Sequence, residues 1–391
     1  MKKALLAILF LFLVLPLEGR RYPFVRVERN QVQFPSGDSP EFRLFLRKLD
    51  SLVRRGSGKV RILHVGGSHV QGGTWSSRLR NDFLALRYGM DGGRGLVFPF
   101  AAGNTNTPAS YYSSAFGNWE TSRCLRPEHT MGLAGMEATA KDTSARVVID
   151  LLPRELRIMQ QRHTFNRVTL MGYGSREPVL LLSKKDTVWG VFSGGLWRFS
   201  LPCYMDWLQI GFVDGAGSYT LEGVYLDKTC PGLTYSEAGI NGASTSSWLR
   251  CDDWESNLSV VMPDLVLFSI GINDIQGHDF SAEKFTDNYR ELIARVRRVN
   301  PRCAILFTGI NDSSLHHHVN PHTAAVEDAF RELAGEYGAA FWDMYDVMGG
   351  YGSMSVWRDA GLAKEDLVHF TPDGYKLIGD LLFDAIMSCG R

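Results

Sequence analysis

The chain has 391 residues, and 45% of them are hydrophobic, which is enough for two domains that each bury a core. Its 42 basic residues (Lys and Arg) balance its 42 acidic residues (Asp and Glu). Without a basic surplus the chain has no long-range attraction for nucleic acid or anionic lipid, so we expect no nucleic acid partner.

The first 19 residues have the pattern of a secretory signal peptide. Lys2 and Lys3 precede an apolar run from Ala4 to Leu17, and the small residue Gly19 follows near the expected cleavage point. An uncleaved membrane anchor is the alternative, but the run is shorter than the roughly 20 residues that a spanning helix needs. We therefore predict that residues 1–19 are removed, and that the mature protein is periplasmic or secreted without stable membrane insertion.

Helices and strands then alternate along most of the chain. Residues 40–55 place apolar side chains at helical spacing, residues 61–65 form a short apolar strand, and residues 74–88 form a second helix. Further strands are predicted at residues 264–271, 303–310 and 339–345, with amphipathic helices after Ser281, before Gly338 and at the C-terminus. Short, continuously apolar strands separated by helices are typical of a parallel sheet covered on both faces, so we predict a doubly wound α/β domain.

Residues 105–235 have a different pattern. They contain short β-type runs separated by Gly, Ser, Asp and Lys, and no convincing helix. We predict a β-sandwich inserted between two parts of the α/β domain, residues 20–104 and 236–391. Aromatic residues of this segment either stack on sugar rings or fill the core of the sandwich, and the pattern favours the core. They include Trp119, Trp189, Trp197 and Trp207.

Cysteines and histidines give no metal site. Six cysteines in an exported chain permit up to three disulfides, whose pairing the sequence leaves open. No Cys-x-x-Cys pair points to zinc. Residues 316–318 are three histidines, but they stand in a polar segment without a partnering cysteine or carboxylate pattern, which favours a solvated loop. We expect neither a metal nor a cofactor.

The stretch HVGGSHVQGG, residues 64–73, places Ser68 in a glycine-rich turn between a strand and a helix. Open α/β folds bind ligands at the carboxyl ends of their strands, and the N–H groups at the start of a helix can face a developing anion. Ser68 therefore has the position of a nucleophile. A serine that only caps the helix is the alternative from these ten residues alone.

Three further stretches supply partners for that serine. In DLVHFTPDGY, Asp366 and His369 are three residues apart, so the carboxylate can orient the imidazole as a base for a hydroxyl. Gly242 stands in INGA, in a turn after a β-type segment, and Asn273 in GIND, directly after an apolar strand. A glycine N–H and a side-chain amide are the donors that an oxyanion hole requires.

These four stretches, in this order, resemble the SGNH or GDSL-type hydrolase family, whose four blocks carry Ser, Gly, Asn and an Asp-x-x-His pair. The resemblance implies a flavodoxin-like sheet and a cofactor-free serine esterase. Ser68 would be the nucleophile, His369 the base and Asp366 the carboxylate that orients it. The N–H groups of Ser68 and Gly242 and the amide of Asn273 would form the oxyanion hole.

One departure from the family concerns Gly67. The family usually has Gly-Asp-Ser where this chain has Gly66, Gly67 and Ser68. Because the triad carboxylate is Asp366, we expect the chemistry to survive with a looser turn. The substitution Gly67→Asp should then leave activity equal or higher, unless the site is adapted to glycine.

The long β-rich segment lies between the first and second blocks. This arrangement resembles bacterial peptidoglycan O-acetylesterases, in which a jelly roll similar to a carbohydrate-binding module interrupts the catalytic domain. The resemblance implies an esterase that removes O-acetyl groups from a glycan, with peptidoglycan as the leading candidate. A polysaccharide (xylan-type) acetyl esterase, an O-acetyltransferase, a lipase or thioesterase-type hydrolase, and an inactive glycan-binding protein are the alternatives.

Overall fold

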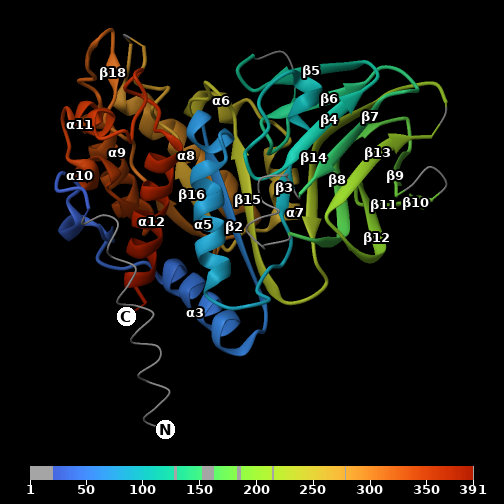
Figure 1. Ribbon diagram of the computed structural model, residues 1–391, viewed down its shortest axis with the longest axis horizontal. Helices are drawn as coiled ribbons and strands as arrows, with labels where there is room; N and C mark the ends of the chain where they lie inside the picture. The colour runs from blue at the N-terminus through green and yellow to red at the C-terminus, as the bar shows by residue number, and fades with distance from the viewer. Residues whose placement is uncertain are drawn as a thin grey trace.

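The structure, a computed structural model, describes residues 21–126, 130–151, 163–182, 186–213, 215–277 and 279–390. The predicted signal peptide, residues 1–19, lies outside them. An α/β layer lies beside a body of antiparallel strands (Figure 1). None of the described helices is long and apolar enough to span a membrane.

The main sheet has six strands in the order β1-β20-β17-β16-β2-β15. All of its neighbouring strands run parallel except β1, which pairs antiparallel with β20. The strands are β1 (Val32–Gln33), β2 (Lys59–Gly66), β15 (Gly232–Gly239), β16 (Leu265–Ser269), β17 (Ala304–Phe307) and β20 (Ala340–Trp342). Counted along the chain, the parallel strands stand in the order 2-1-3-4-5, which is the flavodoxin-like order. The predicted doubly wound sheet is confirmed.

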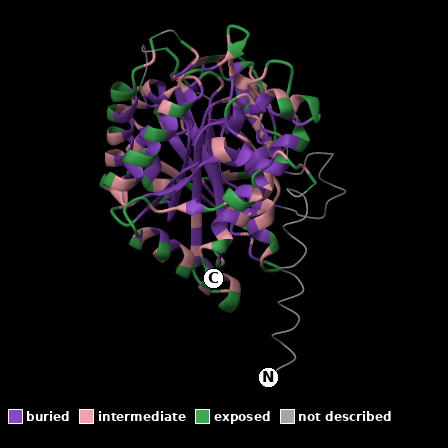
Figure 2. Cartoon of the chain, turned by 90° about the vertical axis from the view of Figure 1, so that its left-hand side faces the viewer, coloured by how far each residue is buried: buried purple, intermediate pink, exposed green. Residues whose placement is uncertain are grey.

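Helices cover both faces of this sheet, which explains why β16 and β17 are apolar and buried along their whole length. One core contains side chains of α3 (Pro40–Arg55), α5 (Thr74–Ala85) and α12 (Pro372–Ser388). The other contains side chains of α7 (Trp254–Val261), α8 (Ala282–Val299) and α9 (Thr323–Tyr337). Figure 2 shows the buried strands at the centre, with helices whose outer faces are exposed.

Short elements connect these layers. They are η1 (Val27–Arg29), α4 (Ser68–Gln71), η2 (Phe100–Gly103), α6 (Thr245–Leu249), α10 (Met344–Met348), α11 (Ser353–Asp359) and the hairpin of β18 (Ser314–Leu315) and β19 (His318–Val319). The helix limits follow local chemistry. For example, α3 begins after Ser39, whose hydroxyl accepts the N–H of Phe42, and ends at Gly56 in the left-handed conformation.

The β-rich body consists of two antiparallel sheets. One has the strand order β10-β9-β13-β7-β4, and the other the order β11-β12-β8-β14-β6-β5 with β3 paired to β14. Their strands are β3 (Gly95–Val97), β4 (Tyr112–Phe116), β5 (Trp119–Arg123), β6 (Met136–Ala140), β7 (Arg146–Asp150), β8 (Phe165–Gly174), β9 (Pro178–Leu181), β10 (Thr187–Trp189), β11 (Val191–Ser193), β12 (Leu196–Met205), β13 (Trp207–Phe212) and β14 (Tyr219–Asp227).

Strand pairing places the limits of this body close to residues 105 and 235, but not at them. At the beginning, β3 already pairs with β14, although it precedes residue 105. At the end, β15 starts at Gly232 and pairs with β2, so the last residues of the range 105–235 belong to the main sheet. Hydrogen bonding between strands, which local composition does not reveal, causes both differences.

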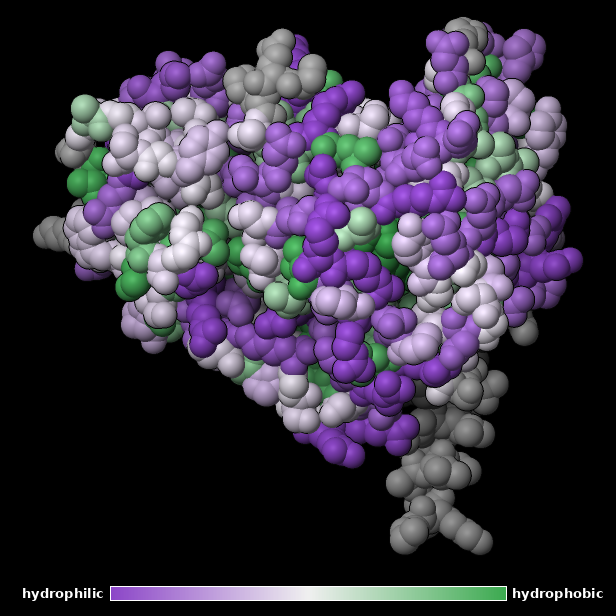
Figure 3. Space-filling model, turned by 180° about the vertical axis from the view of Figure 1, so that it is seen from behind, coloured by the Kyte–Doolittle hydropathy of each residue, from purple (hydrophilic) through white to green (hydrophobic). Residues whose placement is uncertain are grey.

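The tryptophans of the β-rich body are only partly buried. Trp119, Trp197 and Trp207 are half-buried. Trp189 is 60% exposed and stands near exposed Val191 and Phe192. The core position favoured for Trp189 is therefore wrong, because β10 and β11 are short strands at the ends of their two sheets. Elsewhere the rear surface is mostly polar, with small scattered apolar groups (Figure 3).

A buried ion cluster connects the β-rich body to the α/β layer. Glu237 of β15 forms ion pairs with Arg80 of α5 and with Arg94, which stands next to β3. Burial alone would raise the pKa of Glu237, but the two guanidinium groups hold it at about 2. The carboxylate therefore stays charged at neutral pH and satisfies both buried cations, which removal of Glu237 would leave unpaired.

All six cysteines are present as thiols. The side chains of Cys124 and Cys251 are hydrogen-bonded to each other, and this contact together with burial holds the pKa of Cys251 well above its usual range. The sequence left the pairing of the cysteines open, and the structure brings these two together.

Candidate active site

Three neighbouring strands of the main sheet end at the same level, and a predicted site residue follows each of them. The last residue of β2, Gly66, pairs with the last residue of β15 and with the last residue of β16. Ser68, Gly242 and Asn273 come shortly after these three strand ends. The strand order reverses at β2, which is where open α/β sheets bind ligands.

The turn at Ser68 depends on glycine. Ser68 is the first residue of α4, and Gly67 is its N-cap. The N–H groups of Val70 and Gln71 donate to the Gly67 carbonyl over 3.1 and 3.0 Å. A Cβ at Gly66 would lie only 2.3 Å from Cγ2 of Val70. The absence of a side chain there permits the sharp turn from strand to helix.

Ser68, His369 and Asp366 form one hydrogen-bonded chain. Oγ of Ser68 lies 2.8 Å from Nε2 of His369, and Nδ1 of His369 lies 2.9 Å from Oδ2 of Asp366. With the proton on Nδ1 donated to the carboxylate, Nε2 is free to accept the serine proton. The His369 side chain is 32% exposed, so a substrate can reach this chain of groups from solvent.

The loop from 366 to 369 is folded to hold the carboxylate against the imidazole. Oδ1 of Asp366 accepts the N–H groups of Val368 and His369, each over 2.9 Å. Burial opposes ionisation of Asp366, but these N–H groups and the His369 ring lower the pKa of its carboxyl. Leu367 has the left-handed φ of 53° that the tight loop requires. Nδ2 of Asn311 donates to the Val368 carbonyl over 3.0 Å and ties the loop to the segment after β17.

A second histidine lies behind the catalytic candidate. The ring of His69 packs against the ring of His369 with 5.1 Å between centroids, and its Nδ1 lies 2.8 Å from the Tyr375 hydroxyl. Burial and the neighbouring His369 lower the pKa of His69 to about 3. His69 is therefore neutral, and its ring packs against the His369 ring. His69 directly follows Ser68 in sequence, but no local pattern marked it as part of the site.

Gly242 and Asn273 belong to two segments that are hydrogen-bonded to each other. Residues 240–243 form a turn in which the Ala243 N–H donates to the Ile240 carbonyl over 3.0 Å. Gly242 is the third residue of this turn and has a φ of 81°, which favours glycine. Nδ2 of Asn273 donates to the Ala243 carbonyl over 2.9 Å, so the Asn273 amide is fixed against the same turn.

Gly67 lies next to Asn273 and the turn of residues 240–243. A Cβ built on Gly67 would lie 3.0 Å from Nδ2 of Asn273 and 3.5 Å from the Ala243 carbonyl oxygen. The Asn273 amide therefore lies directly beside the residue that precedes Ser68. We expected aspartate to be tolerated at position 67. This contact argues against it, because any side chain there meets the Asn273 amide.

Asp274 fixes the segment that follows the glycine turn. Its carboxylate accepts the N–H of Thr245 over 3.1 Å and the Thr245 hydroxyl over 2.6 Å, and so holds the start of α6. Burial raises the pKa of Asp274 to about 6. The structure thus adds a supporting residue next to Asn273 in sequence.

Among the described residues, no group of three or more His, Cys, Asp or Glu side chains is placed to hold a metal ion. The three histidines at 316–318 belong to the β18–β19 hairpin and are exposed. The base of this hairpin donates the Ser314 N–H to the Leu367 carbonyl over 3.0 Å. The hairpin therefore lies against the Asp366 loop.

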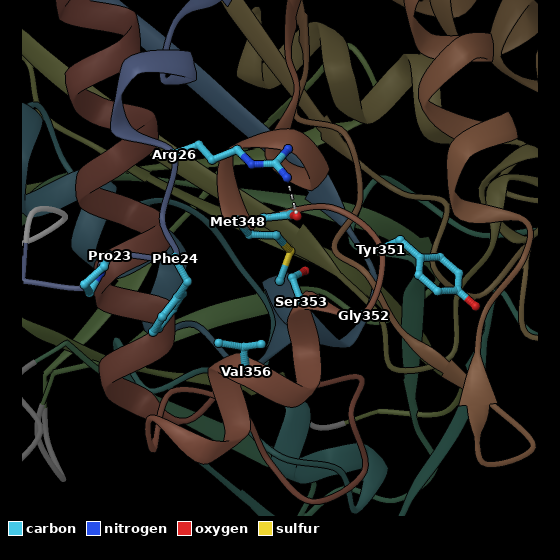
Figure 4. A pocket seen from close by; sticks show the side chains of 9 residues that line it. Pro23, Phe24, Arg26, Met348, Tyr351, Gly352, Ser353 and Val356 are labelled. Carbon is cyan, nitrogen blue, oxygen red and sulfur yellow. Dashed lines mark hydrogen bonds between the residues drawn. The ribbon is translucent and has the colours of Figure 1, made fainter.

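A hollow of about 340 Å³ lies elsewhere, between the segment around Phe24 and the residues of α10 and α11. Figure 4 shows Arg26 at its rim, donating to a neighbouring carbonyl, and Ser353 and Val356 opposite Phe24. Its lining includes none of the predicted site residues, and Arg26 is already paired with Asp346.

A serine, a histidine and a carboxylate at the switch point of a flavodoxin-like sheet, beside a glycine turn and an asparagine amide, define a serine-type carboxylic ester hydrolase. Residues 213–377 match the GDSL-like Lipase/Acylhydrolase family. The chain thus carries a GDSL/SGNH acylhydrolase domain. The matched range contains Gly242, Asn273 and the Asp366–His369 pair, whereas Ser68 precedes it. No curated protein matches the chain significantly in sequence.

The fold has a counterpart over nearly its whole length. A solved structure titled "Peptidoglycan O-acetylesterase in action, 5 min" is 22% identical, with a TM-score of 0.75 over 92% of this chain and 99% of that chain. An acetylxylan esterase from Geobacillus stearothermophilus is 18% identical, with a TM-score of 0.33 over 40% of this chain and 73% of that chain. Another acetyl xylan esterase is 20% identical, with a TM-score of 0.31 over 39% of this chain and 81% of that chain.

Proposed function

We propose that the protein is an exported esterase that removes O-acetyl groups from a carbohydrate, with peptidoglycan as its substrate. The observation that carries the proposal is the hydrogen-bonded chain of Ser68, His369 and Asp366 beside the Gly242 turn and Asn273. The likeness to a peptidoglycan O-acetylesterase supports the choice of glycan, because it extends over the β-rich body as well as the α/β layer.

In the proposed first step, Oγ of Ser68 attacks the acetyl carbonyl carbon while Nε2 of His369 takes the hydroxyl proton. The C–O bond to the sugar then breaks, and His369 returns the proton to the departing sugar oxygen. Water attacks the acetyl-serine in the same way, with His369 again as base, and acetate leaves. Asp366 keeps the proton on Nδ1 throughout and stabilises the imidazolium.

Negative charge develops on the former carbonyl oxygen in both steps. The N–H groups of Ser68 and Gly242 and the amide of Asn273 are the donors proposed to stabilise it. The turn around Gly242 and the bond from Asn273 to the Ala243 carbonyl hold two of these donors before substrate arrives. Such preorganisation is what makes an oxyanion hole effective.

The solvent exposure of the triad supports a substrate that carries a small acyl group on a large polymer. The side chains of His369 and Asp366 are 32% and 47% exposed, so a glycan strand can place an acetyl group at Ser68 without entering a tunnel. The signal-peptide pattern of residues 1–19 supports export to the compartment that contains peptidoglycan.

Acetate release from O-acetylated peptidoglycan, with acetylated xylan and a series of model esters beside it, tests the proposal. We expect acetate from peptidoglycan, less from xylan, and a steep loss of rate as the acyl chain lengthens. Ser68→Ala serves as the inactive control. Preference for xylan or for long acyl chains would show that the proposed substrate is wrong. Transfer of acetyl to a sugar hydroxyl would show that the reaction is acetyl transfer. Glycan binding without turnover would refute the proposed esterase activity.

A further inference from the structure

We infer that Gln71 is a positioning residue of this site: it holds the peptide that precedes Gly242 and thereby sets the Gly242 N–H for the oxyanion. The inference rests on the proposed role of Gly242. It begins from a side chain that the hydrolysis mechanism does not use, but that joins three segments distant in sequence.

Gln71 is buried, with 2% of its surface exposed, and belongs to the same helical turn as Ser68. Its Oε1 accepts the backbone N–H of Asn241 over 2.6 Å. Its Nε2 donates to the carbonyl of Asn106 over 3.0 Å and to the hydroxyl of Thr105 over 3.2 Å. Both ends of the amide are therefore satisfied, and its orientation is fixed.

The contact with Asn241 acts directly on the oxyanion donor. Asn241 and Gly242 are the two central residues of the turn that the Ile240 carbonyl and the Ala243 N–H close. Anchoring the N–H of Asn241 to Gln71 fixes where this turn lies relative to α4. Because Ser68 begins α4, one helical turn sets the distance between the nucleophile and the Gly242 N–H.

The other end of Gln71 brings the segment around residue 106 into the site. Nδ2 of Asn241 donates to Oδ1 of Asn106 over 2.7 Å, on the exposed side of the same contact. The segment therefore braces the glycine turn from outside while Gln71 braces it from inside. Asn106 precedes the strand β4, so the chain that leads into the β-rich body helps to fix the oxyanion turn.

Removal of the Gln71 amide leaves the Asn241 N–H without its acceptor in a partly buried place. The turn then shifts to reach water, and the Gly242 N–H moves with it. Misplacement by about 1 Å costs up to about 100-fold in rate, and complete loss of one oxyanion donor costs about 10²- to 10³-fold. A displaced donor should cost less than a lost one.

The test replaces Gln71 with methionine, which has a similar volume and no amide. On a small acetyl ester we expect kcat to fall about 10- to 100-fold with KM within about 3-fold, because the Gly242 N–H acts mainly in the transition state. Affinity for a small boronic acid that forms a tetrahedral adduct on Ser68 should fall by the same factor. If Gln71 only supported the fold, kcat and boronic acid affinity would not fall by the same factor.

Asn257→Leu is the matched control. Asn257 is also a buried amide that joins two elements, accepting the Leu133 N–H over 3.3 Å and donating to Glu222 over 3.1 Å. It lies outside the site, so its loss should lower the melting temperature without changing kcat. Should Gln71→Met fail to fold, Gln71→Ala takes its place.

The inference would be overturned if the wild type is active and the folded variant, Gln71→Met or Gln71→Ala, has the same kcat and the same boronic acid affinity. A parallel rise in KM without loss of kcat would overturn it as well, because it would assign Gln71 to ground-state binding. A wild type that hydrolyses no acetyl ester and binds no boronic acid would instead refute the proposed function.

Discussion

Substitution of Gly67 by alanine probes the contact between this residue and the Asn273 amide. The added Cβ would lie 3.0 Å from Nδ2 of Asn273, whereas an ordinary contact begins at 3.4 Å. The amide cannot swing freely away, because it is held by its bond of 2.9 Å to the Ala243 carbonyl. Asn273 must therefore move by a few tenths of an ångström or lose that bond.

The size of the expected effect follows from the proposed role of Asn273 as an oxyanion donor. Complete removal of one oxyanion donor costs about 10²- to 10³-fold in kcat. A small displacement that weakens this donor by about 1.4 kcal/mol costs about 10-fold. We therefore expect Gly67→Ala to lower kcat about 10-fold with KM little changed. Gly67→Asp should cost more, about 100-fold, because its carboxylate also competes for the Asn273 N–H and repels the oxyanion.

The assay is steady-state hydrolysis of a small acetyl ester, together with the melting temperature of each variant. Gly215→Ala is the matched control, because a Cβ there meets nothing within 4 Å. It should match the wild type. If Gly67→Ala retained the kcat of the wild type, or if Gly67→Asp raised it, Asn273 would not be constrained beside Gly67 and this reasoning would fail.

Three other variants test the roles of Asn273, Asp366 and Glu222. Asn273→Ala should lower kcat about 10²- to 10³-fold with little change in KM; a lower melting temperature with kcat within a few-fold would make it a turn residue instead. Asp366→Asn should lower kcat by about 10³-fold or more, because it favours the wrong tautomer of His369, and a pH–rate series with near-normal turnover would contradict this. Burial raises the pKa of Glu222 from 4.5 to about 8, so the folded protein holds a proton there that the unfolded chain releases, and stability falls as pH rises through this window. Glu222→Gln should therefore raise the melting temperature at pH above 8 by roughly 5 °C, with little change near pH 4.5; an equal shift at both pH values would count against the buried carboxyl.

Much of the arrangement of the candidate site was predictable because its signals are local. Ser68 stands between a short apolar strand and a helix, and the spacing of Asp366 and His369 lies within one loop. The alternation of strands and helices likewise predicted the α/β layer. In each case a few neighbouring residues determine the structure, and one sequence is enough to recognise the pattern.

The parts that sequence reasoning missed depend on contacts between distant segments. Gln71 meets Asn241 across 170 positions, and no local pattern announces that contact. The clash of a side chain at Gly67 with Asn273 is visible only once β2 and β16 lie side by side. The start of β15 at Gly232 is also set by its partner strand, because its residues are as β-like as those before them.

Covalent labelling by a serine-reactive phosphonate tests most directly whether Ser68 is the nucleophile. We expect one label per chain on Ser68, located by mass spectrometry of the peptide, with loss of acetyl esterase activity in proportion to labelling. Ser68→Ala should remain unlabelled and inactive while keeping the melting temperature of the wild type. Labelling of another residue, or full activity in a fully labelled protein or in Ser68→Ala, would rule out Ser68 as the nucleophile.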